Sequence, residues 1–176
     1  MKSDMKSFFK YFLKVVASAY LGLLVLIVLL TPLRFSHNEI IIAVGSSGIY
    51  VGASVVCLFF LCKREGYHDN NGVAKMQSKR SLILMVISVA TYDLLTIIFQ
   101  YYHPAAASSV TPLAKLIGNI DTKTEVLDMA SDHTGLMLVS LLFLTVPFIP
   151  AMIWGYQSGW KKRKLERESL TQKNES

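Results

Sequence analysis

The residue with the clearest capacity for chemistry is Asp93, the one carboxylate inside the apolar stretch Ser81 to Tyr102. Thr96 and Gln100 follow at i+3 and i+7, so the three side chains share one face of a helix. A carboxyl group there could carry a proton or a cation, or it could be a polar staple between helices. A neutral carboxyl is favoured in both cases, because an inter-helix hydrogen bond in lipid contributes only ~0.6 kcal/mol.

A second group of ionisable residues lies between His103 and His133 and includes Asp121, Asp128 and Asp132. Asp128 and Asp132 would share a helical face, and carboxylates with histidines are the side chains that bind metals or hydrolyse bonds. Their spacing matches no metal-binding motif, and we expect no metal and no cofactor. A solvated acidic face is favoured over an enzyme site at the outer surface.

The rest of the chain contains no spacing typical of catalysis. Cys57 and Cys62 lie five residues apart near the end of an apolar stretch, which predicts neither a disulfide nor a metal site. We find no glycine-rich phosphate loop, nucleophile elbow or cysteine–histidine pair. We therefore expect a protein that is not an enzyme.

Two patterns of small residues could bring helices together. Gly48 and Gly52 are separated by three residues, and Ser18 and Gly22 form a looser version of the same spacing. Small residues at this interval let helix backbones approach closely within lipid. They could pack inside this chain, or they could contact a second copy or a helix of another membrane protein.

All of these helical residues lie in apolar stretches that are long enough to cross a bilayer. About 20 apolar residues span the ~30 Å hydrocarbon core, and 52% of the 176 residues are hydrophobic while 17% are charged. So short a chain has no polar layer thick enough to bury several such helices in water. The sequence predicts an all-α integral membrane four-helix bundle with spans at Val15 to Leu33, Ile40 to Cys62, Ser81 to Tyr102 and Thr134 to Trp160.

The distribution of basic residues predicts the orientation of the bundle. Fifteen of the 18 Lys and Arg residues lie in 1–14, 63–80 and 161–176. Cytoplasmic segments collect positive charge, so these should be a basic N-terminus, a loop and a basic tail, all cytoplasmic. The first apolar stretch should be kept as a span, because no signal-cleavage pattern follows it. The basic run Lys161 to Lys164 should anchor the last span beside anionic lipid and not bind nucleic acid.

Helix geometry predicts which residues share the depth of Asp93. At about 1.5 Å per residue, Asp93 lies about 13 Å below the outer end of its span at Tyr102. The same distance along the second and fourth spans reaches Tyr50 and Thr145. No Lys or Arg lies at that level, so we expect hydroxyl groups or water to hold the carboxyl group.

The connections between spans should differ in character. The short segment from Arg34 to Glu39 makes the first two spans antiparallel neighbours, and loop 63–80 should be solvated. The extracytoplasmic loop 103–133 should be partly helical, and the polar end from Glu166 should be frayed. The helical spacing in the outer loop is carried by Leu113, Leu116, Ile117 and Ile120.

The most economical functional prediction is a multi-pass plasma-membrane protein that works by contact. It would be an accessory subunit of a membrane complex or a small protective protein of the immunity type. Its partners would be the lipid bilayer and either another membrane protein or further copies of itself, and not nucleic acid. The alternative is an oligomeric transporter or channel subunit that uses Asp93 as its proton or cation site.

Overall fold

The computed structural model describes residues 2–33, 39–69, 79–100 and 134–175, and the regular structure in these residues is α-helical. The described residues contain four stretches that are long and apolar enough to cross a membrane, which confirms the predicted all-α membrane bundle. The predicted partly helical loop 103–133 lies outside the described residues. The helices are α1 (Lys2–Leu33), α2 (Glu39–His68), α4 (Lys79–Gln100), α8 (Thr134–Thr145) and α9 (Phe148–Glu175).

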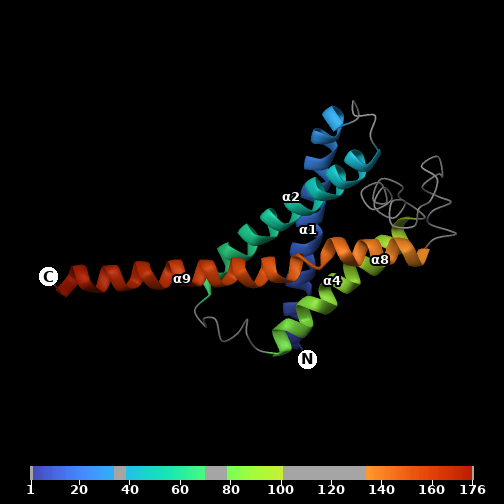
Figure 1. Cartoon of the computed structure of the whole chain (residues 1–176). Helices are drawn as coiled ribbons and strands as arrows, with labels where there is room; N and C mark the ends of the chain where they lie inside the picture. The colour runs from blue at the N-terminus through green and yellow to red at the C-terminus, as the bar shows by residue number, and fades with distance from the viewer. Residues whose placement is uncertain (1, 34–38, 70–78, 101–133, 176) are drawn as a thin grey trace.

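The helices pack in a chain of neighbours with α1 and α2 at its centre. α2 packs against α1 and α9, while α4 packs against α1 and α8 (Figure 1). The start of α1, the end of α2, the start of α4 and the end of α9 lie toward one end of the bundle (Figure 1). The end of α1, the start of α2, the end of α4 and the start of α8 lie toward the opposite end, whereas α8 and α9 meet in the middle (Figure 1).

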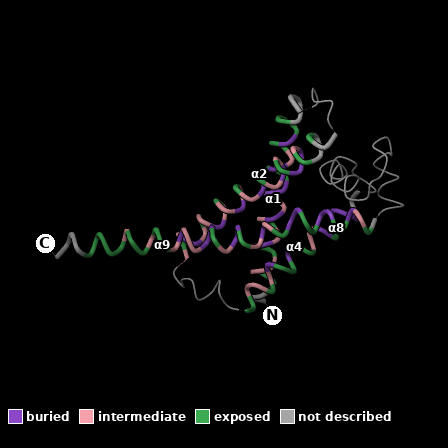
Figure 2. Tube along the Cα trace, viewed as in Figure 1, coloured by how far each residue is buried: buried purple, intermediate pink, exposed green. Residues whose placement is uncertain are grey.

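The core forms where one face of each helix turns inward (Figure 2). On α1 the buried positions Tyr11, Val15, Ser18, Gly22 and Leu26 follow the three- and four-residue intervals of a helical stripe. The opposite faces are apolar too, and Phe143 on α8 is 75% exposed. Exposed large apolar side chains are ordinary for a span, because lipid tails solvate them.

Glycines set the close packing of α2 against α9. A Cβ on Gly66 would overlap the backbone of Tyr156, one on Gly155 that of Phe59, and one on Gly159 that of Lys63. The two backbones therefore approach as closely as only glycine allows, over about two turns of α2 and one turn of α9. The pair Gly155 and Gly159 has the same three-residue interval as Gly48 and Gly52, and that spacing was the available signal for this contact.

The last span is divided into α8 and α9 by a break at Val146 and Pro147. Pro147 has no backbone N–H to donate to the preceding turn, and neither does Pro150. The carbonyl oxygen of Val146 is instead bonded by the N–H of Ile149, three residues on, at 3.3 Å. The two prolines thus turn one continuous apolar stretch into two helices.

Two helices extend past the apolar stretches. α2 continues through the basic residues to His68, and α9 continues to Glu175, so the expected fraying from Glu166 is wrong. Ion pairs at i, i+4 support the extension of α9, between Lys162 and Glu166 at 3.8 Å and between Lys164 and Glu168 at 3.7 Å.

Candidate functional site

Asp93 is a buried side chain of α4, with 1% of its surface exposed, and it faces the end of α8. The Oγ1 atom of Thr145 lies 2.9 Å from its Oδ2 atom, so the two side chains join α4 to α8 by a hydrogen bond. Thr145 is the last residue of α8, directly before the break at Val146 and Pro147. Helix rise predicts these two residues at the same depth, and the structure brings them into contact.

The hydroxyl group of Thr145 can serve either protonation state of Asp93. Its Oγ1 also lies 3.1 Å from the carbonyl oxygen of Leu141. If Asp93 is ionised, Thr145 donates its proton to Oδ2; if Asp93 is neutral, the carboxyl group donates to Thr145, which donates in turn to Leu141. The pair can therefore keep its geometry while a proton is gained or lost.

Tyr50 and Thr96, two of the other predicted polar residues, form hydrogen bonds with partners other than Asp93. The hydroxyl of Tyr50 lies 2.9 Å from that of Tyr92, which precedes Asp93 in the chain. Thr96 donates to the backbone carbonyl of Tyr92 at 2.9 Å, and Gln100 is the last residue of α4. The sequence analysis did not predict a role for Tyr92, because Tyr92 points to a different side of the helix from Asp93. A tyrosine at this depth of a span was nevertheless a signal that could have identified it.

Several buried oxygen atoms around this level have no hydrogen-bond partner among the described residues. Asp93 Oδ1 is one of them, together with the hydroxyl oxygens of Ser47, Ser54 and Ser140. Buried polar atoms in a membrane are normally bonded, and orphans mark places where a proton, cation, water molecule or partner group can bind. The bundle therefore holds spare hydrogen-bonding capacity around the carboxyl group of Asp93.

The two small-residue patterns have opposite surroundings. Ser18 and Gly22 are both buried, and Gly22 lies in the contact between α1 and α2, where a Cβ on it would lie 2.8 Å from the carbonyl oxygen of Tyr50. Gly48 and Gly52 are exposed, and a Cβ on either would have no described atom within 4 Å beyond its chain neighbours and the adjacent backbone of its own helix. The first pattern is used inside the chain, whereas the second faces outward.

The described residues contain no group of three or more His, Cys, Asp or Glu side chains that could hold a metal ion. The acidic and histidine residues between 103 and 133 lie outside the described residues. Cys57 and Cys62 are free thiols.

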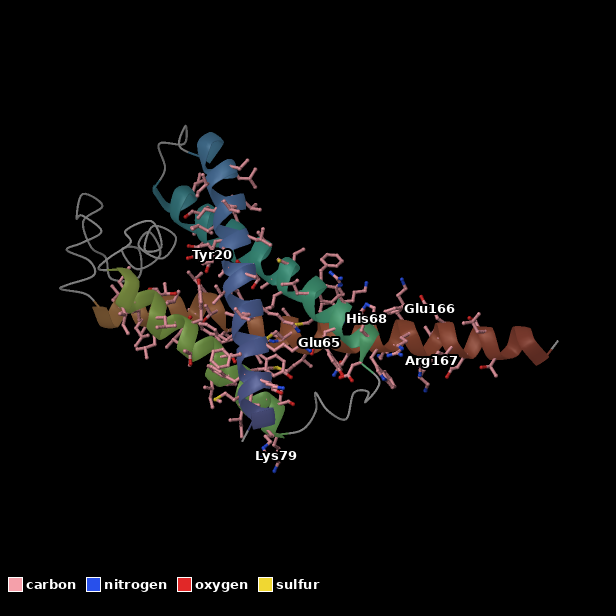
Figure 3. The ribbon with its side chains drawn as sticks, turned by 180° about the vertical axis from the view of Figure 1, so that it is seen from behind. Tyr20, Glu65, His68, Lys79, Glu166 and Arg167 are labelled. Atoms are coloured by element: carbon pink, nitrogen blue, oxygen red, sulfur yellow. The ribbon has the colours of Figure 1, made fainter. Side chains whose placement is uncertain are left out.

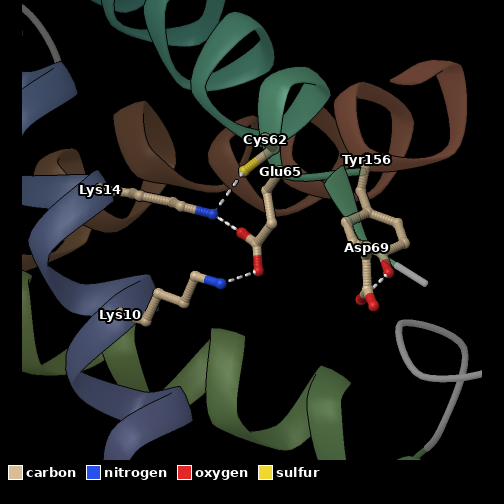
Figure 4. A network of polar contacts seen from close by, with 6 residues as sticks. All are labelled: Lys10, Lys14, Cys62, Glu65, Asp69 and Tyr156. Atoms are coloured by element: carbon tan, nitrogen blue, oxygen red, sulfur yellow. Dashed lines mark hydrogen bonds and ion pairs between the residues drawn. The ribbon is translucent and has the colours of Figure 1, made fainter. Parts of the chain in front are cut away.

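A charged cluster at the other end of α2 was not foreseen from the sequence (Figure 4). Glu65 forms ion pairs with Lys10, at 2.5 Å, and with Lys14, and both Lys14 and Glu65 are largely buried. The Nζ atom of Lys14 also lies 4.0 Å from Cys62 Sγ. Tyr156 donates a hydrogen bond to Asp69. The sequence placed Lys14 in a solvated segment and Glu65 in a loop, and only the continuation of α2 brings them together.

Comparison of the chain with protein-family models, with curated proteins and with solved structures gives no match. The fold and the arrangement of side chains are therefore the basis for inferring a function.

Proposed function

We propose that this four-span membrane protein acts by contact, as an accessory subunit of a membrane complex or as an immunity-type protective protein. The supporting observation is the outward face of α2 that contains Gly48 and Gly52. We define this contact face by its exposed members Val44, Gly48, Gly52, Val56 and Phe60.

The contact face carries two glycines, one helical turn apart, that face away from the other described helices. Gly22, Gly66, Gly155 and Gly159 each lie where a backbone of the same chain approaches. Gly48 and Gly52 leave a similarly shallow strip with no described neighbour on it. The flat strip between Val44 and Val56 allows another transmembrane helix to approach closely, and dispersion forces stabilise such a contact in lipid.

The proposal is tested by photo-crosslinking in native membranes. A benzoylphenylalanine introduced at Gly52 should give a discrete protein adduct, whereas the same group at Leu94, which is 57% exposed on α4, should react with lipid. Gly48→Leu should remove the adduct without reducing the amount of folded protein, since Gly48 has open space around it. Identical products from both positions would contradict the proposal.

The identity of the crosslinked protein distinguishes a homo-oligomer from a complex with another membrane protein. An adduct with a second copy indicates a homo-oligomer, and an adduct with another membrane protein indicates an accessory or protective role. In the accessory case, deletion of this protein should impair the activity of that partner. In the protective case, deletion should make cells sensitive to a membrane-acting toxin.

Asp93 supports a second candidate function, that of a transporter or channel subunit with a proton or cation site. The supporting observation is that Oδ1 is buried and has no partner while Oδ2 is bonded to Thr145. Asp93→Asn should then abolish proton or cation flux into proteoliposomes while leaving expression and assembly unchanged. A variant that only loses stability would favour the staple interpretation.

A further inference from the structure

A pocket of about 430 Å³ opens at the end of the bundle where α1 begins and α2 ends. Its wall combines cationic, acidic and apolar side chains from these two helices. Figure 3 shows Glu65 and His68 in the last turns of α2, beside α9. The lining residues are Lys10, Leu61, Arg64, Glu65, His68 and Asp69.

The acidic residues of this pocket are already engaged within the protein. Glu65 is held by Lys10 and Lys14, and Asp69 accepts a hydrogen bond from Tyr156. A cation entering the pocket would have to compete with these internal donors. The pocket therefore offers little capacity for binding positive charge.

Its spare capacity lies in donors of hydrogen bonds. Arg64 is exposed and has neither an ion pair nor a hydrogen bond within the described part of the chain. Among the described residues, the ring of His68 contacts that of Tyr67, and Lys10 retains ammonium protons beyond its ion pair with Glu65. The guanidinium group of Arg64 presents a planar fork of N–H donors that can bind two oxygen atoms at once. This geometry matches phosphate and carboxylate groups.

The position of the pocket favours a lipid headgroup, and not a free anion, as the group that would supply a phosphate. Leu61 lies where the apolar part of α2 ends, and Lys63 lies 5.8 Å from the ring centres of Phe59 and Phe60. Aromatic and basic residues side by side mark the headgroup level of a bilayer. Phe60 is 59% exposed and Leu13, one turn from Lys10, is 63% exposed, so acyl chains can lie directly below the pocket.

We propose that this pocket binds the phosphate headgroup of an anionic phospholipid, with Arg64 as the principal ligand and His68 and Lys10 beside it. The acyl chains lie on the apolar surface next to Leu13 and Phe60. Basic pockets between transmembrane helices at the cytoplasmic side are a recurrent way to bind anionic lipid. None of the residues that line the headgroup pocket belongs to the contact face, although the acyl chains would share Phe60 with it. The proposal does not depend on the function proposed above.

The test compares lipid retention by the purified full chain in detergent, using native mass spectrometry with equimolar dioleoyl-phosphatidylglycerol and dioleoyl-phosphatidylcholine. Arg64→Gln should lower retention of phosphatidylglycerol by about tenfold, the loss expected for one charge-assisted phosphate contact. Arg167→Gln is the matched control, because it removes the same charge from an exposed position on α9 that lies outside the pocket. It should leave retention unchanged.

Three results would overturn the proposal. The first is equal retention of the two lipids by the unmodified chain, and the second is an equal loss in Arg64→Gln and Arg167→Gln, which would indicate a diffuse charge effect. The third is displacement of phosphatidylglycerol by inorganic phosphate alone, which would assign the pocket to a free anion. Arg64 has no partner in the described residues, so Arg64→Gln should fold, and its circular dichroism and monodispersity check this.

Discussion

The contact between Asp93 and Thr145 shows what a single hydroxyl group does in the middle of a span. It forms a hydrogen bond with one carboxyl oxygen on a neighbouring helix, although the two residues are 52 positions apart in sequence. The other oxygen, Oδ1, is left for a proton, a cation or a partner. The same residue can therefore be a staple and a site, and the two roles respond differently to substitution.

Thr145→Val should lower the free energy of unfolding by about 0.6 to 1.7 kcal/mol, the range measured for inter-helix hydrogen bonds in lipid. Unfolding in mixed micelles measures this loss. Thr91→Val is the control, because Thr91 is not buried and its hydroxyl donates only to Ile87 of its own helix. An equal effect of both variants would show that the bond to Asp93 stabilises nothing.

Glu65→Gln should be more damaging than the loss of an exposed ion pair. It leaves Lys14, whose side chain is only 13% exposed, without a counter-charge, and we expect a loss of about 2 kcal/mol or more. Lys14→Met in the same chain should recover most of that loss, since a paired charge is then replaced by apolar packing. Glu168→Gln, at an exposed pair with Lys164, should change stability little.

At the scale of the helices, α2 is the element that organises the molecule. One face packs against α1 through Gly22 and Ser54, another lies against α9 through Gly155 and Gly159, and the outward face carries Gly48 and Gly52. Glycine spacing identifies positions where helices can approach closely. It does not say whether the approaching helix belongs to the same chain.

Substitution of glycines by valine should separate the inward from the outward positions. Gly22→Val should destabilise the fold strongly, because its Cβ would overlap Ser54 and crowd the carbonyl oxygen of Tyr50. Gly52→Val should leave thermal stability in detergent nearly unchanged. A large loss with Gly52→Val would mean that the contact face is covered within the chain, which would contradict its proposed role.

At the scale of the whole molecule, the two ends of the bundle differ in chemistry. One end carries the charged cluster at Glu65, the pocket beside Arg64 and the helical extension of α9 (Figure 3). The extension is tied to α2 as far as Glu166, which accepts a hydrogen bond from Tyr67 at 2.5 Å. Residues beyond it are exposed as far as Thr171. We propose that this end is cytoplasmic, as the distribution of Lys and Arg predicts.

Cysteine labelling tests this orientation. In a chain with Cys57 and Cys62 replaced, Ser169→Cys should react with a membrane-impermeant maleimide only after cells are permeabilised. Ser109→Cys should react in intact cells, since its loop is expected on the outer side. Labelling of Ser169→Cys in intact cells would reverse the proposed topology and assign the phospholipid pocket to the outer leaflet.

Sequence alone determined the class of fold, because the length of apolar stretches depends only on composition and on helix rise. The same rise put Thr145 at the depth of Asp93. Tertiary structure decided which neighbour each residue meets: Tyr50 meets Tyr92, Lys14 meets Glu65, and Gly48 and Gly52 face outward. Helix rotation and the length of α2 and α9 set these contacts. A span that is apolar on nearly all sides does not reveal from its sequence which face turns inward, because lipid solvates any apolar face.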